Sequence, residues 1–205
     1  MPGPTRWAGI SRDDRRSERR SLLVKAAFEL FGEGGEAAVS VRSVCRASEL
    51  NSRYFYESFD DTAELIGVVY DEVAAELAAS VTAATTLPTD DDRALLRSGI
   101  RAVLDFSSTD PRRGKILCPA PRGHALLAPR RAAARDELRE LVLTESTRSD
   151  PESEQLAREV TAAMYAGAMA ELANQWLAGQ LGDDLDAVVT HAVRLLLPEQ
   201  NAPDR

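Results

Sequence analysis

Aromatic and basic side chains crowd into one short segment whose spacing is that of a helix with two different faces. Four of the chain's eleven aromatic residues fall within six positions, as Tyr54, Phe55, Tyr56 and Phe59. At about 100° per residue, the two phenylalanines share one helix face, the tyrosines lie to either side, and Arg53 points away. The segment therefore predicts a helix that buries two rings and presents two phenol hydroxyls and a guanidinium. The alternative is a core helix with tyrosines at its rim.

The residues before this segment predict a second short helix and a tight turn. Ser40 can cap that helix, because a serine oxygen accepts a hydrogen bond from a first-turn amide, and Asn51 can cap the aromatic helix in the same way. Leu50 supplies an apolar plug in the turn. The apolar face of this preceding helix consists of Val41, Val44 and Cys45. Two short helices joined by such a turn form a helix-turn-helix. The second helix along the chain, here the aromatic helix, enters the major groove of DNA.

This segment and its flanks resemble the tetracycline-repressor (TetR) family of bacterial regulators. Two positions depart from the family pattern, because Glu49 stands where the turn usually has glycine and Thr62 where the next helix usually has lysine. The matching positions are Arg19, Arg20, Leu23, Ala26, Ala27, Leu30, Phe31, Gly34, Gly35, Ser40, Val41, Arg42, Val44, Leu50, Tyr56, Phe59 and Leu65.

The outward face of the aromatic helix and the resemblance together assign DNA contacts. We expect Arg53 and Tyr54 to approach bases, and Arg42, Ser52 and Tyr56 to hold phosphates. The resemblance also implies that Thr62 lies beside the DNA backbone.

The charge distribution allows DNA binding although the net charge is −8. Residues 1–60 carry 10 basic and 9 acidic side chains, whereas the remainder carries 15 and 24. Six arginines lie within residues 1–20, where phosphates would be met. A solvated tail of mixed charge is the alternative.

The whole chain is predicted to be helical, since alanine is abundant and alternating β-branched runs are absent. We expect an all-α protein of about nine helices, with an N-terminal arm and helix-turn-helix domain over 1–60 and a larger helical domain over 61–205. The expected longer helices cover about 15–33, 62–86, 90–108, 129–147, 152–179 and 184–197.

Small and apolar residues on the last two long helices suit a four-helix contact between two subunits, because small side chains permit close helix approach. The alternative is packing within one subunit, and the resemblance favours a homodimer. The residues predicted at this interface are Ala163, Ala166, Gly167, Ala170, Val189 and Leu196.

The resemblance also implies a pocket for a small-molecule effector in the larger domain. The candidate lining residues are Tyr70, Phe106, Cys118, His124, Met164 and Asn174. The alternative for each of them is an ordinary core or surface residue without a ligand contact. A nucleophile–base pair of Cys118 and His124 is the remote enzymatic alternative. Neither histidine of the chain lies in a metal-spaced cluster, so we expect no enzyme, no metal and no cofactor.

These patterns predict a cytoplasmic, homodimeric transcriptional regulator that leaves a palindromic operator in double-stranded DNA when a small molecule binds. They favour a repressor over an activator. The chain contains no apolar run long enough for a membrane span, and its two cysteines suggest no disulfide framework. A helical small-molecule-binding protein with a degenerate DNA-binding unit is the alternative, motivated by Glu49 and Thr62.

Overall fold

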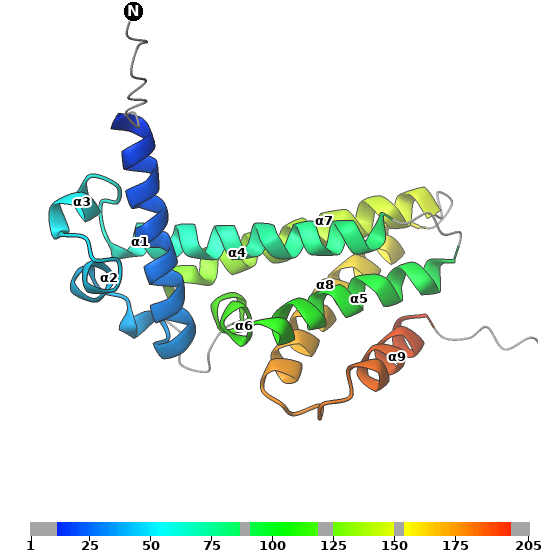
Figure 1. The fold of residues 1–205 in the computed structure, drawn as a ribbon. Helices are drawn as coiled ribbons and strands as arrows, with labels where there is room; N and C mark the ends of the chain where they lie inside the picture. The colour runs from blue at the N-terminus through cyan, green and yellow to red at the C-terminus, as the bar shows by residue number, and fades with distance from the viewer. Residues whose placement is uncertain (1–11, 87–90, 119–124, 150–153, 198–205) are drawn as a thin grey trace, which may run out of the picture. The chain divides into compact units, whose positions relative to one another are not determined.

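Helices account for all regular structure in the described part of the chain. The computed structural model describes residues 12–86, 91–118, 125–149 and 154–197 (Figure 1). The predicted all-α fold, with an N-terminal helix-turn-helix and a larger helical part, is confirmed. Contacts divide the chain into the units Met1–Val69 and Tyr70–Arg205. This division falls inside α4 (Thr62–Thr85), whereas the boundary predicted after residue 60 precedes that helix.

The first unit is built on α1 (Arg12–Gly34), against which the short helices η1 (Glu36–Ala38), α2 (Val41–Ala47) and α3 (Ser52–Tyr56) pack. Gly35 ends α1 with φ +73°, a conformation that glycine adopts without strain, as its position after the helix predicted. The buried apolar core of this unit comprises Leu23, Val24, Ala26, Ala27, Phe31, Val39, Val44, Phe55, Phe59, Leu65, Ile66 and Val69.

Side-chain caps fix where the short helices begin. The Ser40 hydroxyl accepts from the Ser43 amide at 3.1 Å, and Asn51 Oδ1 accepts from the Tyr54 amide at 3.2 Å. Both caps confirm the sequence predictions. At the start of α4, Asp61 Oδ1 accepts from the Glu64 amide at 2.8 Å. Each cap satisfies one amide that the first helical turn leaves without a backbone partner.

The second unit consists of five α-helices and the remainder of α4 in the described residues. They are α5 (Asp92–Thr109), α6 (Pro111–Leu117), α7 (Ala128–Ser149), preceded by η2 (Ala125–Leu127), α8 (Gln155–Leu177) and α9 (Leu185–Leu196). Helix α7 packs on α8, and α5 packs on α6, α8 and α9. Their buried core includes Ile100, Leu104, Met169, Ala173, Val189 and Val193.

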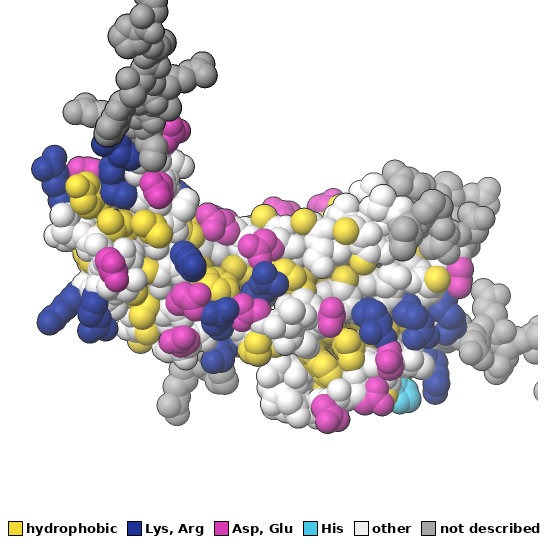
Figure 2. Space-filling view, in the orientation of Figure 1, with side chains coloured by type: hydrophobic (Ala, Val, Ile, Leu, Met, Phe, Trp, Pro, Cys, Tyr) yellow, Lys and Arg dark blue, Asp and Glu magenta, His cyan; other side chains and the backbone are white. Residues whose placement is uncertain are grey.

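A row of three arginines on α5 ties α9 to that core. Arg101 pairs with Asp186 near the start of α9, Arg97 Nη1 donates to Thr190 Oγ1 at 3.0 Å, and Arg93 Nη2 donates to the Leu197 carbonyl at its end. The row follows from the i, i+4, i+8 spacing, which places all three side chains on one helix face. Figure 2 shows basic side chains gathered between α5 and α9.

Helix boundaries in the second unit lie close to those predicted, with one shorter element. Helix α8 covers 155–177 rather than 152–179, while 150–153 lie outside the described residues. Glycines at 179 and 182 adopt positive φ and lead the chain into α9. Within the described ranges, none of the helices combines the length and apolarity that a membrane crossing requires.

Candidate nucleic-acid interface

The turn between α2 and α3 has the backbone geometry of a left-handed helix exit. The Leu50 amide donates to the Cys45 carbonyl at 3.0 Å and the Glu49 amide to the Arg46 carbonyl at 3.4 Å. These two bonds are those of a Schellman motif, which requires a left-handed residue between them. Glu49 adopts that conformation with φ 57°. The motif therefore forms although the residue is not glycine.

Two phenylalanines hold α3 in the core of the first unit. Phe55 is fully buried and Phe59 is 2% exposed, and their ring centroids lie 5.9 Å apart. The expectation that both rings lie on one helix needs correction, because α3 ends at Tyr56 and Phe59 follows it. The Phe59 amide still donates to the Phe55 carbonyl at 2.9 Å, so the last turn keeps the two rings together.

The predicted base-reading and phosphate-holding side chains occupy the surface of α2, α3 and the start of α4. The Arg53 side chain is 84% exposed and Tyr56 is 61% exposed. Arg42 and Ser52 are also exposed, whereas Tyr54 and Thr62 are half-buried. All six lie in or next to the three helices that form and follow the helix-turn-helix. Helix α3 thus has one apolar face packed in the core and one polar face accessible to solvent.

Side chains from α1 reach the end of α3. The Arg19 guanidinium lies 4.5 Å from the Tyr54 ring centroid, and its Nη2 is 3.7 Å from a Glu57 carboxylate oxygen. Arg16 Nη2 donates to the Glu57 backbone carbonyl at 2.7 Å. Arg53 Nε donates to the Glu57 carboxylate at 3.1 Å. Helix α1 therefore positions both the ring and the acid that flank the outward-facing arginine.

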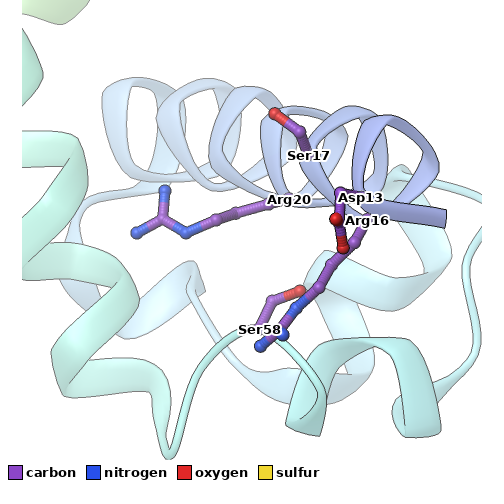
Figure 3. Close-up of a pocket in the computed structure, with 5 residues that line it drawn as sticks. All are labelled: Asp13, Arg16, Ser17, Arg20 and Ser58. Atoms are coloured by element: carbon purple, nitrogen blue, oxygen red, sulfur yellow. The ribbon is translucent and has the colours of Figure 1, made fainter. Parts of the chain in front are cut away.

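An open hollow of about 300 Å³ lies beside this contact (Figure 3). Arg16 and Arg20 of α1 both line it, as does Ser58 in the loop before α4. The Arg20 guanidinium also lies 4.7 Å from the Phe59 ring centroid. Asp13 and Ser17 complete the lining. In Figure 3 the Arg16 side chain runs toward Ser58, whereas Arg20 extends in another direction. A guanidinium beside a hydroxyl suits a phosphate oxygen, and the Asp13 carboxylate in the same lining opposes it.

Basic groups are distributed over α1, α2 and α3 rather than gathered in one field. Figure 2 shows Lys and Arg side chains over these helices with acidic side chains between them. Of the six arginines within residues 1–20, Arg6 lies outside the described residues and the other five lie in α1.

The predicted effector-lining residues do not all share one environment. Tyr70 is 4% exposed and its ring centroid lies 6.0 Å from the Arg131 guanidinium. Arg131 also donates to carbonyls at the end of α6, including that of Cys118, so Tyr70 and Cys118 lie around one arginine. Phe106 is buried beneath the Arg113 guanidinium at 4.6 Å.

The remaining three candidates differ from that group. Met164 is 69% exposed, which places it on the surface of α8 rather than inside the unit. Asn174 is half-buried on the same helix, and His124 lies outside the described residues. A shared pocket for all six residues therefore stays a prediction.

Burial makes Cys118 a poor nucleophile. Desolvation raises the pKa of its thiol to about 11, against a smaller lowering by Arg131. A catalytic cysteine needs a lowered pKa, since the thiolate is the reactive form. The electrostatic environment of Cys118 thus opposes the enzymatic alternative.

The six predicted interface residues fall into two groups. Ala163, Gly167 and Ala170 are exposed on α8, and Leu196 is half-buried on α9. Ala166 is 2% exposed and Val189 is fully buried within the chain. The latter two side chains have no surface left for a partner, because α8 and α9 both contribute to the core of the second unit.

Sequence reasoning missed the part played by α1. Glu57 and Arg53 are four residues apart, so their pairing could be found from helical spacing. Arg16 and Arg19 could not, because they meet Glu57 and Tyr54 through tertiary packing across more than 30 residues.

Comparison with known proteins identifies the first unit. Residues 23–69 match the family described as bacterial regulatory proteins, tetR family. A 62-residue segment is 33% identical to the HTH-type transcriptional repressor Rv3405c of Mycobacterium tuberculosis and to the HTH-type transcriptional regulator Mb3439c of Mycobacterium bovis. That segment covers 30% of this chain and 33% of each relative, so the chain spans about a third of the length of the curated relatives it matches.

Solved structures share the fold over most of the chain. The fatty acid degradation regulator FadR from Bacillus halodurans superposes with a TM-score of 0.70 at 17% identity, covering 89% of this chain and 96% of that chain. A tetR-family transcriptional regulator from Pectobacterium atrosepticum gives 0.64 at 21% identity, covering 91% and 93%. At these identities the likeness shows the fold alone.

Proposed function

The chain belongs to the TetR family of bacterial regulators through its N-terminal region, and from this premise we propose that it is a homodimeric repressor of transcription that binds a palindromic operator and is released by a small molecule. The match of residues 23–69 supports transcription regulation and DNA binding by a helix-turn-helix. The repressor role, the palindrome, the dimer and the effector are the proposal.

The geometry of α3 carries the proposal. Two buried phenylalanines fix the helix, while Arg53, 84% exposed in its side chain, and Tyr56 present polar groups to solvent. A major groove admits one helix, and an arginine that reaches it can make paired hydrogen bonds to guanine O6 and N7. Arg53 therefore reads bases, with Tyr54 beside it, and Arg42, Ser52, Tyr56 and Thr62 meet the sugar-phosphate backbone.

An exposed apolar face on α8 supports the dimer. Leu156, Val160 and Met164 are 63%, 48% and 69% exposed and repeat every four residues, so they lie on one helix face. The face continues with small exposed residues at 163, 167 and 170. Large exposed apolar surfaces mark interaction sites, and a second copy would cover this one. Two reading helices would then lie about 34–36 Å apart or a multiple of it.

The effector would act through the second unit. A small molecule can weaken DNA binding only if it binds better to a conformation in which the two reading helices have unsuitable spacing. Tyr70 and Cys118, brought together around Arg131, are the candidates that the fold supports most directly.

The alternative of a degenerate DNA-binding unit loses one of its two motives. The turn adopts the required left-handed conformation with glutamate in place of glycine. The second motive, Thr62 in place of the family's usual lysine, remains, and it concerns affinity rather than the fold of the motif.

Selection of genomic DNA bound by the purified chain tests the proposal. The expected result is a short inverted repeat, and a sequence without two-fold symmetry would contradict the dimeric mode. Arg53→Ala should weaken operator binding by about 1–3 kcal/mol and relax preference at particular base pairs. Arg135→Ala, the same loss of charge on the exposed surface of α7, is the matched control and should leave preference unchanged.

The dimer contact has its own test. Ala170→Glu should split the dimer in sedimentation and abolish specific binding together, because it places a charge in the apolar contact. Ala79→Glu, on an exposed part of α4, is the matched control. A wild-type monomer at micromolar concentration would contradict this part of the proposal.

A further inference from the structure

Glu57 makes three different interactions, one with Arg53 of the reading helix and two with arginines of α1. Its carboxylate accepts from Arg53 Nε at 3.1 Å and lies 3.7 Å from Arg19 Nη2. Its backbone carbonyl accepts from Arg16 Nη2 at 2.7 Å. The residue therefore fixes an outward-facing arginine of α3 against two arginines of α1.

The atoms used in this contact leave a defined part of Arg53 available. The bond to Glu57 engages Nε, so the two Nη groups at the end of this exposed guanidinium are the donors that remain for DNA. An arginine makes its paired contact with guanine O6 and N7 through two such parallel N–H groups. An unrestrained arginine samples many rotamers, and fixing it before binding removes that entropic cost.

We infer that Glu57 is a positioning residue that sets sequence specificity by holding Arg53 for a guanine contact, while its charge repels phosphates from the same face. The inference rests on the proposed function. A carboxylate next to the reading helix disfavours every phosphate that approaches it, whatever the sequence. It therefore weakens binding to operator and random DNA alike, whereas the oriented arginine strengthens binding to the correct bases only. The arginine contact alone raises the operator-to-random ratio.

Arg19 keeps the carboxylate in place. Its side chain is 25% exposed, and it lies over the Tyr54 ring while approaching Glu57. A planar guanidinium can stack on a ring and approach a carboxylate at once, which an ammonium group does less well. Arg19→Lys is therefore expected to reproduce part of the loss of Glu57.

The ion pair between Arg53 and Glu57 is exposed, with 84% of the Arg53 side chain and 37% of the Glu57 side chain accessible to solvent. Exposed ion pairs contribute little to stability. A role in positioning is therefore separable from a role in stability, and the two predict different results.

Affinity for the selected operator and for random duplex DNA, measured with the full chain at several salt concentrations, tests the inference. Glu57→Ala should bind random DNA about two- to fivefold more tightly and lower the operator-to-random ratio at least about tenfold. Glu57→Gln loses the charge but keeps an oxygen that can accept from Arg53, so it should raise random binding equally and lower the ratio less. Glu33→Gln makes the same charge change on α1, about 21 Å along that helix from Arg19, and should alter neither quantity.

A double-mutant cycle separates positioning from general charge. In the Arg53→Ala background, Glu57→Ala should leave the base preference unchanged, because the arginine it orients is already absent. An unchanged operator-to-random ratio in Glu57→Ala would overturn the inference. So would equal losses on both DNAs together with a lower melting temperature, which would show a structural role. A wild-type chain without any sequence preference would instead refute the proposed function itself.

Discussion

The left-handed turn residue Glu49 leads to a stability prediction for the helix-turn-helix. A residue with a Cβ in this conformation costs roughly 1–2 kcal/mol relative to glycine in the folded state. Glycine in turn adds about 0.4–1 kcal/mol of chain entropy to the unfolded state. Glu49→Gly should therefore raise the free energy of local unfolding by about 0.5–1 kcal/mol, the difference between these opposing effects.

The charge of Glu49 must be separated from its backbone conformation. An acid near the C-terminal end of α2 is unfavourable by roughly 0.3–1 kcal/mol, because helix carbonyls carry partial negative charge there. Glu49→Ala removes the charge and retains the Cβ, so the difference between the Gly and Ala variants isolates the backbone effect. Since the residue is exposed, neither substitution leaves a cavity.

Hydrogen exchange of amides within 41–59 measures this difference locally, without requiring the two units to unfold together. Exchange in Glu49→Gly should be about two- to fivefold slower than in Glu49→Ala, which corresponds to 0.5–1 kcal/mol. Equal exchange in the two variants would refute the reasoning, because it would show that the strain of the positive φ does not exceed the chain entropy that glycine adds to the unfolded state.

Three further predictions concern other parts of the chain. Thr62→Lys should tighten operator binding and steepen the slope of log affinity against log salt by about −1.8 for a dimer, since each protomer neutralises one more phosphate; an unchanged slope in salt titrations would place Thr62 away from the backbone. Gly114→Ala should destabilise the second unit by about 1–3 kcal/mol in urea unfolding, because the added Cβ would lie 2.7 Å from a Leu177 methyl group. At the control position Gly167 an added Cβ meets nothing within 4 Å in the chain, so Gly167→Ala should leave the stability unchanged. Burial holds the pKa of the Cys118 thiol at about 11, above the ordinary 9.0, so the thiol loses its proton first in the unfolded state and stability should fall between pH 9 and 11. Cys118→Ala should remove this part of the alkaline loss of melting temperature. An identical pH profile of melting temperature in both proteins would contradict the prediction.

Local signals in the sequence predicted the elements of the first unit because those elements depend on local chemistry. Caps at Ser40 and Asn51 and the exit at Gly35 use bonds or dihedral angles within a few residues. Such features are visible in a short window of sequence. The end of α3 was less predictable, since Phe59 keeps its packing partner although regular helix stops three residues earlier.

Candidate residues in the second unit were less predictable, because helical periodicity does not distinguish burial within one chain from burial against a partner. Ala166 and Gly167 are neighbours with similar small side chains, yet the first is buried and the second is exposed. Met164, an apolar residue assigned to a pocket, lies on the surface. Which face of α8 packs against α5 and α7 decides which of these side chains are buried.

The amino-acid sequence by itself determined that the chain is helical, where its short helices begin, and that an aromatic helix follows a turn, since caps, propensities and spacing act over a few residues. Tertiary structure alone decided what surrounds that helix. Packing brings Arg16 and Arg19 of α1 to Glu57 and Tyr54, more than 30 residues away, and no local pattern encodes such a meeting. The physical reason is that charge and ring contacts depend on distance in space, which only the packed core fixes.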